Sequence, residues 1–261
     1  MNLDSKNIRQ FTNNFSELER VIDTGYVDPS VMFKVDKFAR TILQNNVLQL
    51  VASFNNLDPF LTTPANLYLA SDNSNDTFEV VIEYIDQNRD KQLMNVNLTG
   101  TTPVDLGSDI YCIFRMYNNN GVDQVGTRVV VTSNVTGIPI DDTEVYCDMI
   151  LTSGVAANQS LTGIFSVPRN YSAFVTKASI TADKGSDLKG AFFIRQEGRV
   201  FRFVKALETF QQQSVSYDMF ERGLEKTDFR PIAIAQTGGL AYFEYTVICI
   251  HNDYLDKFIR S

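Results

Sequence analysis

The sequence predicts a mainly β protein in which antiparallel β-sandwich or jelly-roll modules follow an N-terminal helical segment. Between Leu161 and Asn252, short apolar runs alternate with turn residues at nearly even spacing, which is typical of antiparallel sandwiches. Between Asn66 and Tyr117, apolar positions recur at every second residue, as they do in strands. Before residue 55 they recur at every third or fourth residue, as they do in helices.

The N-terminal segment, residues 1–60, is predicted to be a helical anchor that packs on the β body or on a neighbouring molecule. Its first helix spans residues 5–23 and ends before Gly25. A second helix is predicted to start at Asp28-Pro29, because aspartate followed by proline is typical of a helix N-terminus. Its wide apolar face comprises Val31, Val35, Phe38, Ala39, Ile42, Leu43, Val47, Leu50 and Phe54. The stretch around residues 48–54 could instead be a strand.

Residues 61–150 are assigned to a first β-sandwich module. Strands are predicted around Phe78–Ile85 and Ile110–Tyr117, where both faces are apolar, which suits strands that lie between other layers. Turn residues follow each of these strands, and no linker of low complexity separates this module from the next.

Residues 151–261 are assigned to a second β-sandwich or jelly-roll module. Seven runs of strand length are bounded mostly by Gly, Pro, Asp or Asn. They are LTGIFSVP, YSAFVTKASITA, LKGAFFIR, RVFRFVKALETF, SVSYDMF, DFRPIAIAQ and LAYFEYTVICIHN. Hairpin turns are predicted at residues 183–187, 197–198 and 237–239.

The composition excludes several classes of partner. The chain of 261 residues has a diffuse net charge of −8, which argues against nucleic-acid binding, because that binding depends on Lys and Arg at phosphates. No apolar run of 18 residues is present, so no membrane span is predicted, and the N-terminus has no secretory signal. Cys112, Cys147 and Cys249 are expected to be buried free thiols of a protein assembled in a reducing cytosol.

No catalytic, cofactor-binding or metal-binding residue can be nominated, and the chain is predicted not to be an enzyme. His251 is the only histidine, the cysteines lack paired spacing, and no G-x-S-x-G or phosphate-binding glycine loop occurs. His251 is expected to be a polar residue at the end of a strand. A glycosidase needs two carboxylates, but nothing selects a pair among 31 acidic residues.

Two weaker patterns are interpreted as structural. Residues Asp72–Asp76, with Glu83 at position twelve, echo a calcium-binding loop, but position six is Thr77 rather than Gly. We expect a solvated turn there, with Glu83 on a strand that points away. Four tyrosines could form a carbohydrate platform, although packing fits their alternating positions better; they are Tyr68, Tyr111, Tyr117 and Tyr242.

Several turns and strands resemble a family of tailed-bacteriophage virion structural proteins. The similar stretches are IEYIDQNRDKQLMNVNLTGTTPVDLGSDIYCIFRMYNNNG, TRVVVTSN, IFSVPRNYSAFVTKASITADKGSDLKGAFFIRQEGRVFRFVKALETF and EKTDFRPIA. Within them, 86–88, 98–104 and 114–117 match the family's D-x-N turn, its L-x-G-T-T-P-V strand and its Arg-aromatic strand. The resemblance runs from Phe78 to Asn252. It departs at Glu197-Gly198-Arg199, which lacks the family's double glycine, and it leaves residues 1–60 uncovered.

The resemblance implies a non-enzymatic building block of a virion, assembled in the cytoplasm of a bacterial host. Its expected partners are other virion proteins and copies of itself in a homo-oligomer, with no cofactor, nucleic acid or membrane. The expected place is capsid decoration, a minor capsid position or the head–tail neck. The alternative is a tail- or fibre-associated module for host recognition, which binds a receptor or glycan. A virion-borne glycan hydrolase is a more distant possibility.

Overall fold

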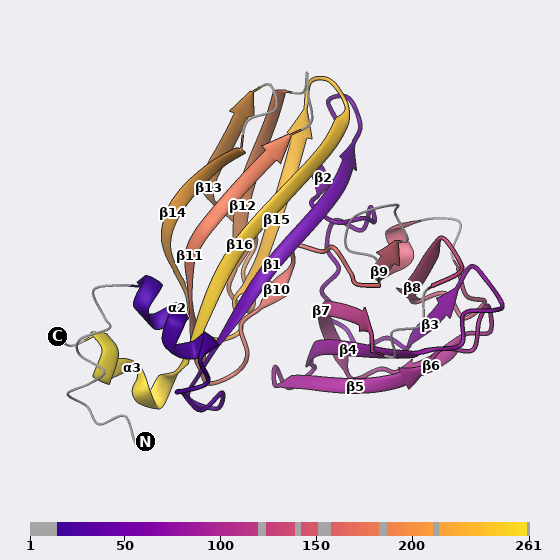
Figure 1. The fold of residues 1–261 in the computed structure, drawn as a ribbon, viewed down its shortest axis with the longest axis horizontal. Coiled ribbons are helices and arrows are strands. Elements are labelled where there is room, and N and C mark those ends of the chain that lie inside the picture. The colour runs from indigo at the N-terminus through magenta and orange to yellow at the C-terminus, as the bar shows by residue number, and fades with distance from the viewer. Residues whose placement is uncertain are drawn as a thin grey trace.

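The computed structural model describes residues 15–119, 124–138, 142–150, 158–182, 187–210 and 214–259. In this part of the chain, antiparallel strands form nearly all of the regular structure. They are arranged as a tall sandwich of long strands with a smaller sandwich beside its lower half (Figure 1). The predicted fold class, mainly β with antiparallel sheets, is therefore confirmed.

The tall sandwich consists of two facing sheets. Phe192 and Phe243 stack between them, with ring centroids 6.2 Å apart. The first sheet has the order β1 (Met32–Leu43), β16 (Gly239–His251), β11 (Tyr171–Ala182) and β14 (Ser214–Gly223). The second has the order β10 (Phe165–Ser166), β15 (Asp228–Ala235), β12 (Asp187–Arg195) and β13 (Arg202–Phe210), and β2 (Gln49–Leu50) also pairs with β15. All seven runs predicted between residues 161 and 252 contain a strand.

Strands β2 and β10 occupy one strand position between them. β2 pairs antiparallel with β15 at Ile232 and Ala233, and β10 continues in the same direction at Asp228 and Phe229. Between these two pairings, the carbonyl oxygen of Pro231 accepts a bond from the Val51 amide at 3.1 Å. Proline has no N–H to donate to a neighbouring strand, and the chain leaves the sheet at this point to form the smaller sandwich.

The smaller sandwich lies within residues 67–150 and also has two sheets. One sheet has the order β6 (Val104–Gly107), β3 (Leu67–Ser71), β8 (Arg128–Thr132) and β9 (Val145–Ile150), with a short 3-10 turn, η1 (Asp142–Glu144), before β9. The other has the order β5 (Lys91–Asn97), β4 (Glu79–Asp86) and β7 (Ile110–Asn118). Leu69, Ile82 and Ile113 are among the residues of its core. The strands predicted around residues 78–85 and 110–117 are thus confirmed.

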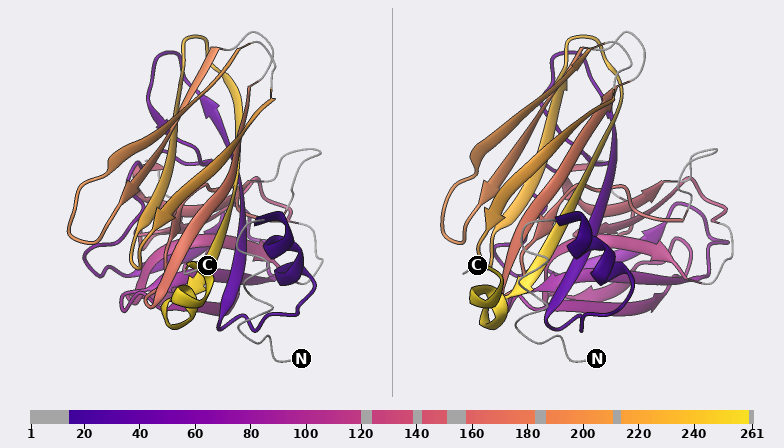
Figure 2. Two further views of the ribbon diagram at one scale, coloured as in Figure 1. Left: turned by 90° about the vertical axis from the view of Figure 1, so that its left-hand side faces the viewer. Right: turned by 60° about the vertical axis from the view of Figure 1, so that its left-hand side comes forward.

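Two helices lie at the lower end of the tall sandwich (Figure 2). α2 (Phe15–Asp23) is the described part of the predicted helix over residues 5–23. It ends as expected at Gly25, whose φ is +70° and whose amide donates to the Ile22 carbonyl oxygen. Residues 5–14 of that prediction lie outside the described residues. α3 (Asn252–Ile259) was not predicted, and its Leu255 packs with Met32 and Ile250.

The second predicted helix, which starts at Asp28, is wrong, because β1 forms in its place. The alternative of a strand around residues 48–54 is confirmed by β2. Asp28 accepts bonds from the Ser30 amide (2.9 Å) and hydroxyl (2.8 Å), so it forms a tight turn that leads into β1. The misleading signal was Val35, Ala39 and Leu43, because positions four apart fit both a helical stripe and one face of a strand. The described part of the N-terminal segment is therefore one helix and two strands that join the sheets of the tall sandwich. The division into folding units at residues 60 and 150 stays a prediction.

Candidate functional site

The two sandwiches meet along a shared apolar core. Phe114 on β7 packs edge-on against Phe165 on β10, with ring centroids 5.5 Å apart and ring planes at 86°. Cys112, also on β7, lies in the same core. Ile113 and Met116 of the same strand face the core of the smaller sandwich, on either side of an irregularity in the pairing with β4. Strand β7 therefore has one face in each core, and we call the place where the sandwiches touch the junction.

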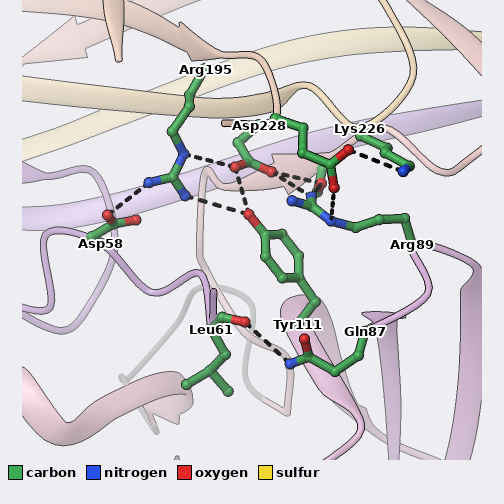
Figure 3. A network of polar contacts seen from close by, with 10 residues as sticks. Asp58, Leu61, Gln87, Arg89, Tyr111, Arg195, Lys226 and Asp228 are labelled. Atoms are coloured by element: carbon green, nitrogen blue, oxygen red, sulfur yellow. Dashed lines mark hydrogen bonds and ion pairs between the residues drawn. The ribbon is translucent and has the colours of Figure 1, made fainter. Parts of the chain in front are cut away.

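A buried carboxylate lies at the centre of the junction (Figure 3). It belongs to Asp228, the first residue of β15, which is 1% exposed. Its Oδ1 accepts hydrogen bonds from Arg89 Nη1 at 3.1 Å and from Ser166 Oγ at 2.7 Å. Its Oδ2 accepts hydrogen bonds from Tyr111 Oη at 2.7 Å and from Arg195 Nε at 3.0 Å. Two guanidinium groups from different sandwiches thus share one carboxylate.

Two more carboxylates lie at the rim of this network (Figure 3). Asp58 accepts a bond of 2.9 Å from Arg195 Nη1, and Glu197 Oε1 lies 4.0 Å from Arg89 Nε. Both rim side chains are about half exposed, so water screens them and each contributes little on its own. Glu197 also pairs with Lys226 at 3.0 Å, so the network contains three carboxylates and three cations and its formal charges balance.

The turn between β4 and β5 presents Arg89 to the junction. Arg89 has a φ of +68°, and its amide donates to the Asp86 carbonyl oxygen at 2.9 Å. This conformation lays the guanidinium on the ring of Tyr111, 3.3 Å from the ring centroid. Burial and the neighbouring Asp228 carboxylate raise the pKa of Tyr111, so the phenol keeps its proton and remains a donor. Arg89 and Tyr111 of the smaller sandwich both bind Asp228 of the tall sandwich, and we call this set of contacts the clamp.

A polar pocket of about 280 Å³ opens beside the junction, between β1 and the sheet of β4, β5 and β7. Lys37 on β1 is 6% exposed, and its ammonium group donates a hydrogen bond to the Phe114 carbonyl oxygen. Burial lowers the pKa of Lys37 to about 8. The charged side chains that line the pocket are Lys34, Asp36, Lys37, Glu83, Lys91 and Arg115.

The cysteines and the histidine lie where the sequence predicts. Cys112, Cys147 and Cys249 are buried free thiols, and burial raises the pKa of each, that of Cys147 to about 12. His251 is the last residue of β16, and its ring packs edge-on against Tyr171 with centroids 5.1 Å apart. Of the four tyrosines considered as a platform, Tyr111 is buried in the junction instead.

The Asp72–Asp76 loop is a hydrogen-bonded turn, as expected, but only its first four residues reach the solvent, and Asp76 is buried. The buried Asp76 carboxylate accepts bonds from the Ser71 hydroxyl (2.5 Å) and from the amides of Val125 (2.6 Å) and Gly126 (3.1 Å). Glu83 lies on β4 and faces Arg115 and Lys91 instead of the loop. Within the described residues, no group of three or more His, Cys, Asp and Glu side chains could hold a metal ion.

The residues that form the junction and the pocket were not predicted as site residues from the sequence. Lys37 was placed on a helix, so its burial between two apolar strand positions was not expected. Arg89 was part of a predicted turn, and Asp228 was only the first residue of the predicted strand run DFRPIAIAQ. An aspartate before an apolar run, as in Asp228-Phe229, is also ordinary turn chemistry, and it does not identify a partner, which here is 139 positions away.

Comparisons with known proteins do not assign the chain to a family. No family model matches it, and no curated protein matches it. Among solved structures, one of the infectious bursal disease virus Gx strain matches with a TM-score of 0.27 and 9% identity, over 85% of this chain and 73% of that one. The cowpea mosaic virus top component, titled naturally occurring empty particles, matches with a TM-score of 0.21 and 9% identity, over 71% of this chain and 80% of that one.

A mitogen from Yersinia pseudotuberculosis matches with a TM-score of 0.20 and 8% identity, over 34% of this chain and 84% of that one. All three TM-scores are far below 0.5, so no argument about fold or function is based on these likenesses. Separately, none of the helices in the described ranges is long and apolar enough to cross a membrane.

Proposed function

We propose that this chain is a non-enzymatic structural subunit of a virus particle and acts by packing against copies of itself in a symmetric assembly. The observation that carries the proposal is the strand order of the tall sandwich. One sheet runs β1-β16-β11-β14, and the other runs from the β2/β10 position through β15 and β12 to β13. Every connection except the β12–β13 hairpin passes from one sheet to the other.

We assign eight strand positions connected in this way to a jelly roll, which is the fold of many viral capsid subunits and also of lectins and cupins. On this assignment the smaller sandwich is an insertion within one strand position, where β2 gives way to β10. The buried clamp between Arg89 and Asp228 supports a structural role, because it fixes the insertion against the jelly roll. The step from jelly roll to virion is an analogy between folds, and the sequence resemblance supports it independently.

The finer proposal is that the particle is a tailed bacteriophage and that the subunit decorates the capsid, holds a minor capsid position or belongs to the head–tail neck. Assembly would then take place in the bacterial cytoplasm, with other virion proteins as partners. The resemblance between residues 78 and 252 supports this placement. The alternative, a tail- or fibre-associated module that binds a receptor or glycan, shares the same fold class, since lectins are also jelly rolls.

The direct test is the association state of the full chain. We expect light scattering on a sizing column and negative-stain electron microscopy to show a discrete homo-oligomer. Val200, which is 83% exposed next to the edge strand β13, is the first candidate for a subunit contact. Val200→Asp should shift the equilibrium toward the monomer, whereas Val135→Asp, at a 63% exposed turn position, should not. A chain that stays monomeric and is absent from virus particles would overturn the proposal.

The number of copies per particle separates the finer placements. Hundreds of copies indicate capsid decoration, and six or twelve indicate a neck or tail position. Binding of the purified chain to host cells or to a glycan array, with no self-association, would favour the recognition module.

A further inference from the structure

We propose that the pocket between β1 and the sheet of β4, β5 and β7 is a binding site for a small molecule that carries an oxyanion group, such as a carboxylate, sulfate or phosphate. The inference concerns ligand binding and does not depend on the proposed role in a virus particle. The pocket, at about 280 Å³, is near the lower end of the range for small-molecule sites.

The first argument is the charge of the lining. Four cationic side chains and only two carboxylates line the pocket, whereas the whole chain carries a net charge of −8. Cations that converge on a concave surface concentrate the positive potential there. An anion is therefore the ligand class that the pocket attracts most strongly.

The second argument is that the lining carboxylates are already in use. Glu83 Oε1 lies 3.5 Å from Arg115 Nη1, and Glu83 Oε2 lies 3.8 Å from Lys91 Nζ. Both distances exceed the 2.7–2.9 Å that is typical of a charge-assisted hydrogen bond, so the two cations keep donor capacity for a ligand. On the other wall, Lys34 Nζ lies 3.0 Å from Asp36 and 2.8 Å from Asp23, which is not part of the lining. Lys37, Lys91 and Arg115 are therefore the cations that remain for a ligand.

Lys37 also has donor capacity that the protein does not use. An ammonium group has three donors, and within the described residues that of Lys37 donates to one acceptor, the Phe114 carbonyl oxygen, and forms no ion pair with a carboxylate. A buried charge without a counter-ion is costly. An oxyanion in the pocket would supply the missing negative charge and further acceptors.

The groups that surround Lys37 determine how binding should depend on pH. Asp36 flanks it on β1, Glu83 faces it from β4, Lys91 from β5, Arg115 and Cys112 from β7, and Cys147 from β9. Burial raises the pKa of both thiols, so they stay neutral near pH 8. The pKa of Lys37 is about 8. Its charge is therefore the one expected to disappear first as the pH rises, and bound anion should hold it protonated.

The test uses sulfate, because its charge is constant between pH 6 and 10, and acetate as the carboxylate probe. Calorimetric titration of the full chain, at an ionic strength held constant with chloride, should show saturable binding of at least one probe at pH 7. Lys37→Met keeps the length of the side chain and should weaken binding by at least about tenfold, the effect of losing a single favourable charge contact. The matched control, Lys189→Met, alters an exposed lysine on β12 and should leave the affinity unchanged.

The pH series tests the same site without a variant. Above pH 8, the affinity of the natural chain should fall by up to about tenfold per pH unit, because binding must restore the lost proton. Arg115→Gln provides a second test if Lys37→Met does not fold, and it should also weaken binding. Absence of saturable binding by both sulfate and acetate, or equal affinities in the natural chain and Lys37→Met, would overturn the proposal.

Discussion

The hydroxyl of Tyr111 donates a hydrogen bond of 2.7 Å to Asp228 Oδ2 across the junction, although 117 positions separate the two residues. Tyr111→Phe removes this bond and keeps the ring on which Arg89 lies. Because Arg195 still donates to the same oxygen, we expect the free energy of unfolding to fall by only about 1–2 kcal/mol. Urea denaturation would measure the change. Tyr242→Phe, on the half-buried outer face of the tall sandwich, should change it by less than about 0.5 kcal/mol.

Removal of the Asp228 charge should lower the free energy of unfolding much more than Tyr111→Phe does. Asp228→Asn preserves the shape but leaves Arg89 and Arg195 without their shared counter-ion. Breaking a buried pair by neutralising one partner typically costs about 3–5 kcal/mol. The exposed Arg169–Asp90 pair, with its side chains 47% and 37% exposed, is the control, and Asp90→Asn should cost less than about 1 kcal/mol. If both variants lost the same stability, the junction network would not be the clamp described here.

Lys37 should make stability rise between about pH 8 and pH 10. Its pKa is lowered to about 8 in the folded chain, against an ordinary value of 10.5 for lysine, so in this window the unfolded chain binds the proton and the folded chain does not. Stability rises with pH wherever the unfolded state binds more protons. The loss of stability caused by the buried charge of Lys37 is therefore fully present below pH 8 and decreases above it. The gain should be on the order of a few kcal/mol.

A comparison with Lys37→Met isolates this effect from the cysteines. The raised pKa values of the three buried thiols act in the opposite direction above pH 9, because the unfolded chain loses those protons first. The natural chain and Lys37→Met share the thiols, so the difference between their urea-unfolding free energies reports Lys37 alone. A difference that stays constant from pH 7 to pH 10 would show that Lys37 is not buried as a charged group.

Most of the β structure could be predicted from the sequence, because alternation and turn residues are local signals. β11 begins and ends at the residues that bound the predicted run YSAFVTKASITA. β1 could not be predicted, because its apolar positions fit two periods equally well. Pairing with β16 favours the strand over the helix. The helical interpretation placed Ile42 on a buried face, but in the strand this residue is 72% exposed.

The junction and the pocket could not be predicted, because both depend on pairing between distant segments. Asp228 meets Arg89 only because β10 and β2 share one edge of β15, which brings the inserted sandwich back to the tall one. The sequence shows a charged residue at the start of an apolar run but gives no local indication of which cation will reach it. The same is true of Lys37, whose hydrogen-bond acceptor is 77 positions away.

The turn at Gly100 provides a final prediction about how the smaller sandwich closes. Gly100 has a φ of +65°, and a Cβ placed there would lie 2.5 Å from the Ser74 carbonyl oxygen. Gly198 has a similar φ of +70°, but a Cβ there would meet nothing within 4 Å. Both Gly→Ala variants carry the cost of a left-handed conformation, about 1–2 kcal/mol. Only Gly100→Ala also forces the backbone of the Asp72–Asp76 loop to move.

We therefore expect Gly100→Ala to lower the free energy of unfolding in urea by at least about 1 kcal/mol more than Gly198→Ala does. The left-handed conformation costs both variants the same, so it cannot account for this difference. The loss should be accompanied by faster amide hydrogen exchange at Val125 and Gly126, whose amides donate to Asp76 in that loop. Equal losses in the two variants, with unchanged exchange at those amides, would mean that the Ser74 backbone yields without cost. The close contact at Gly100 would then play no part in fixing the loop.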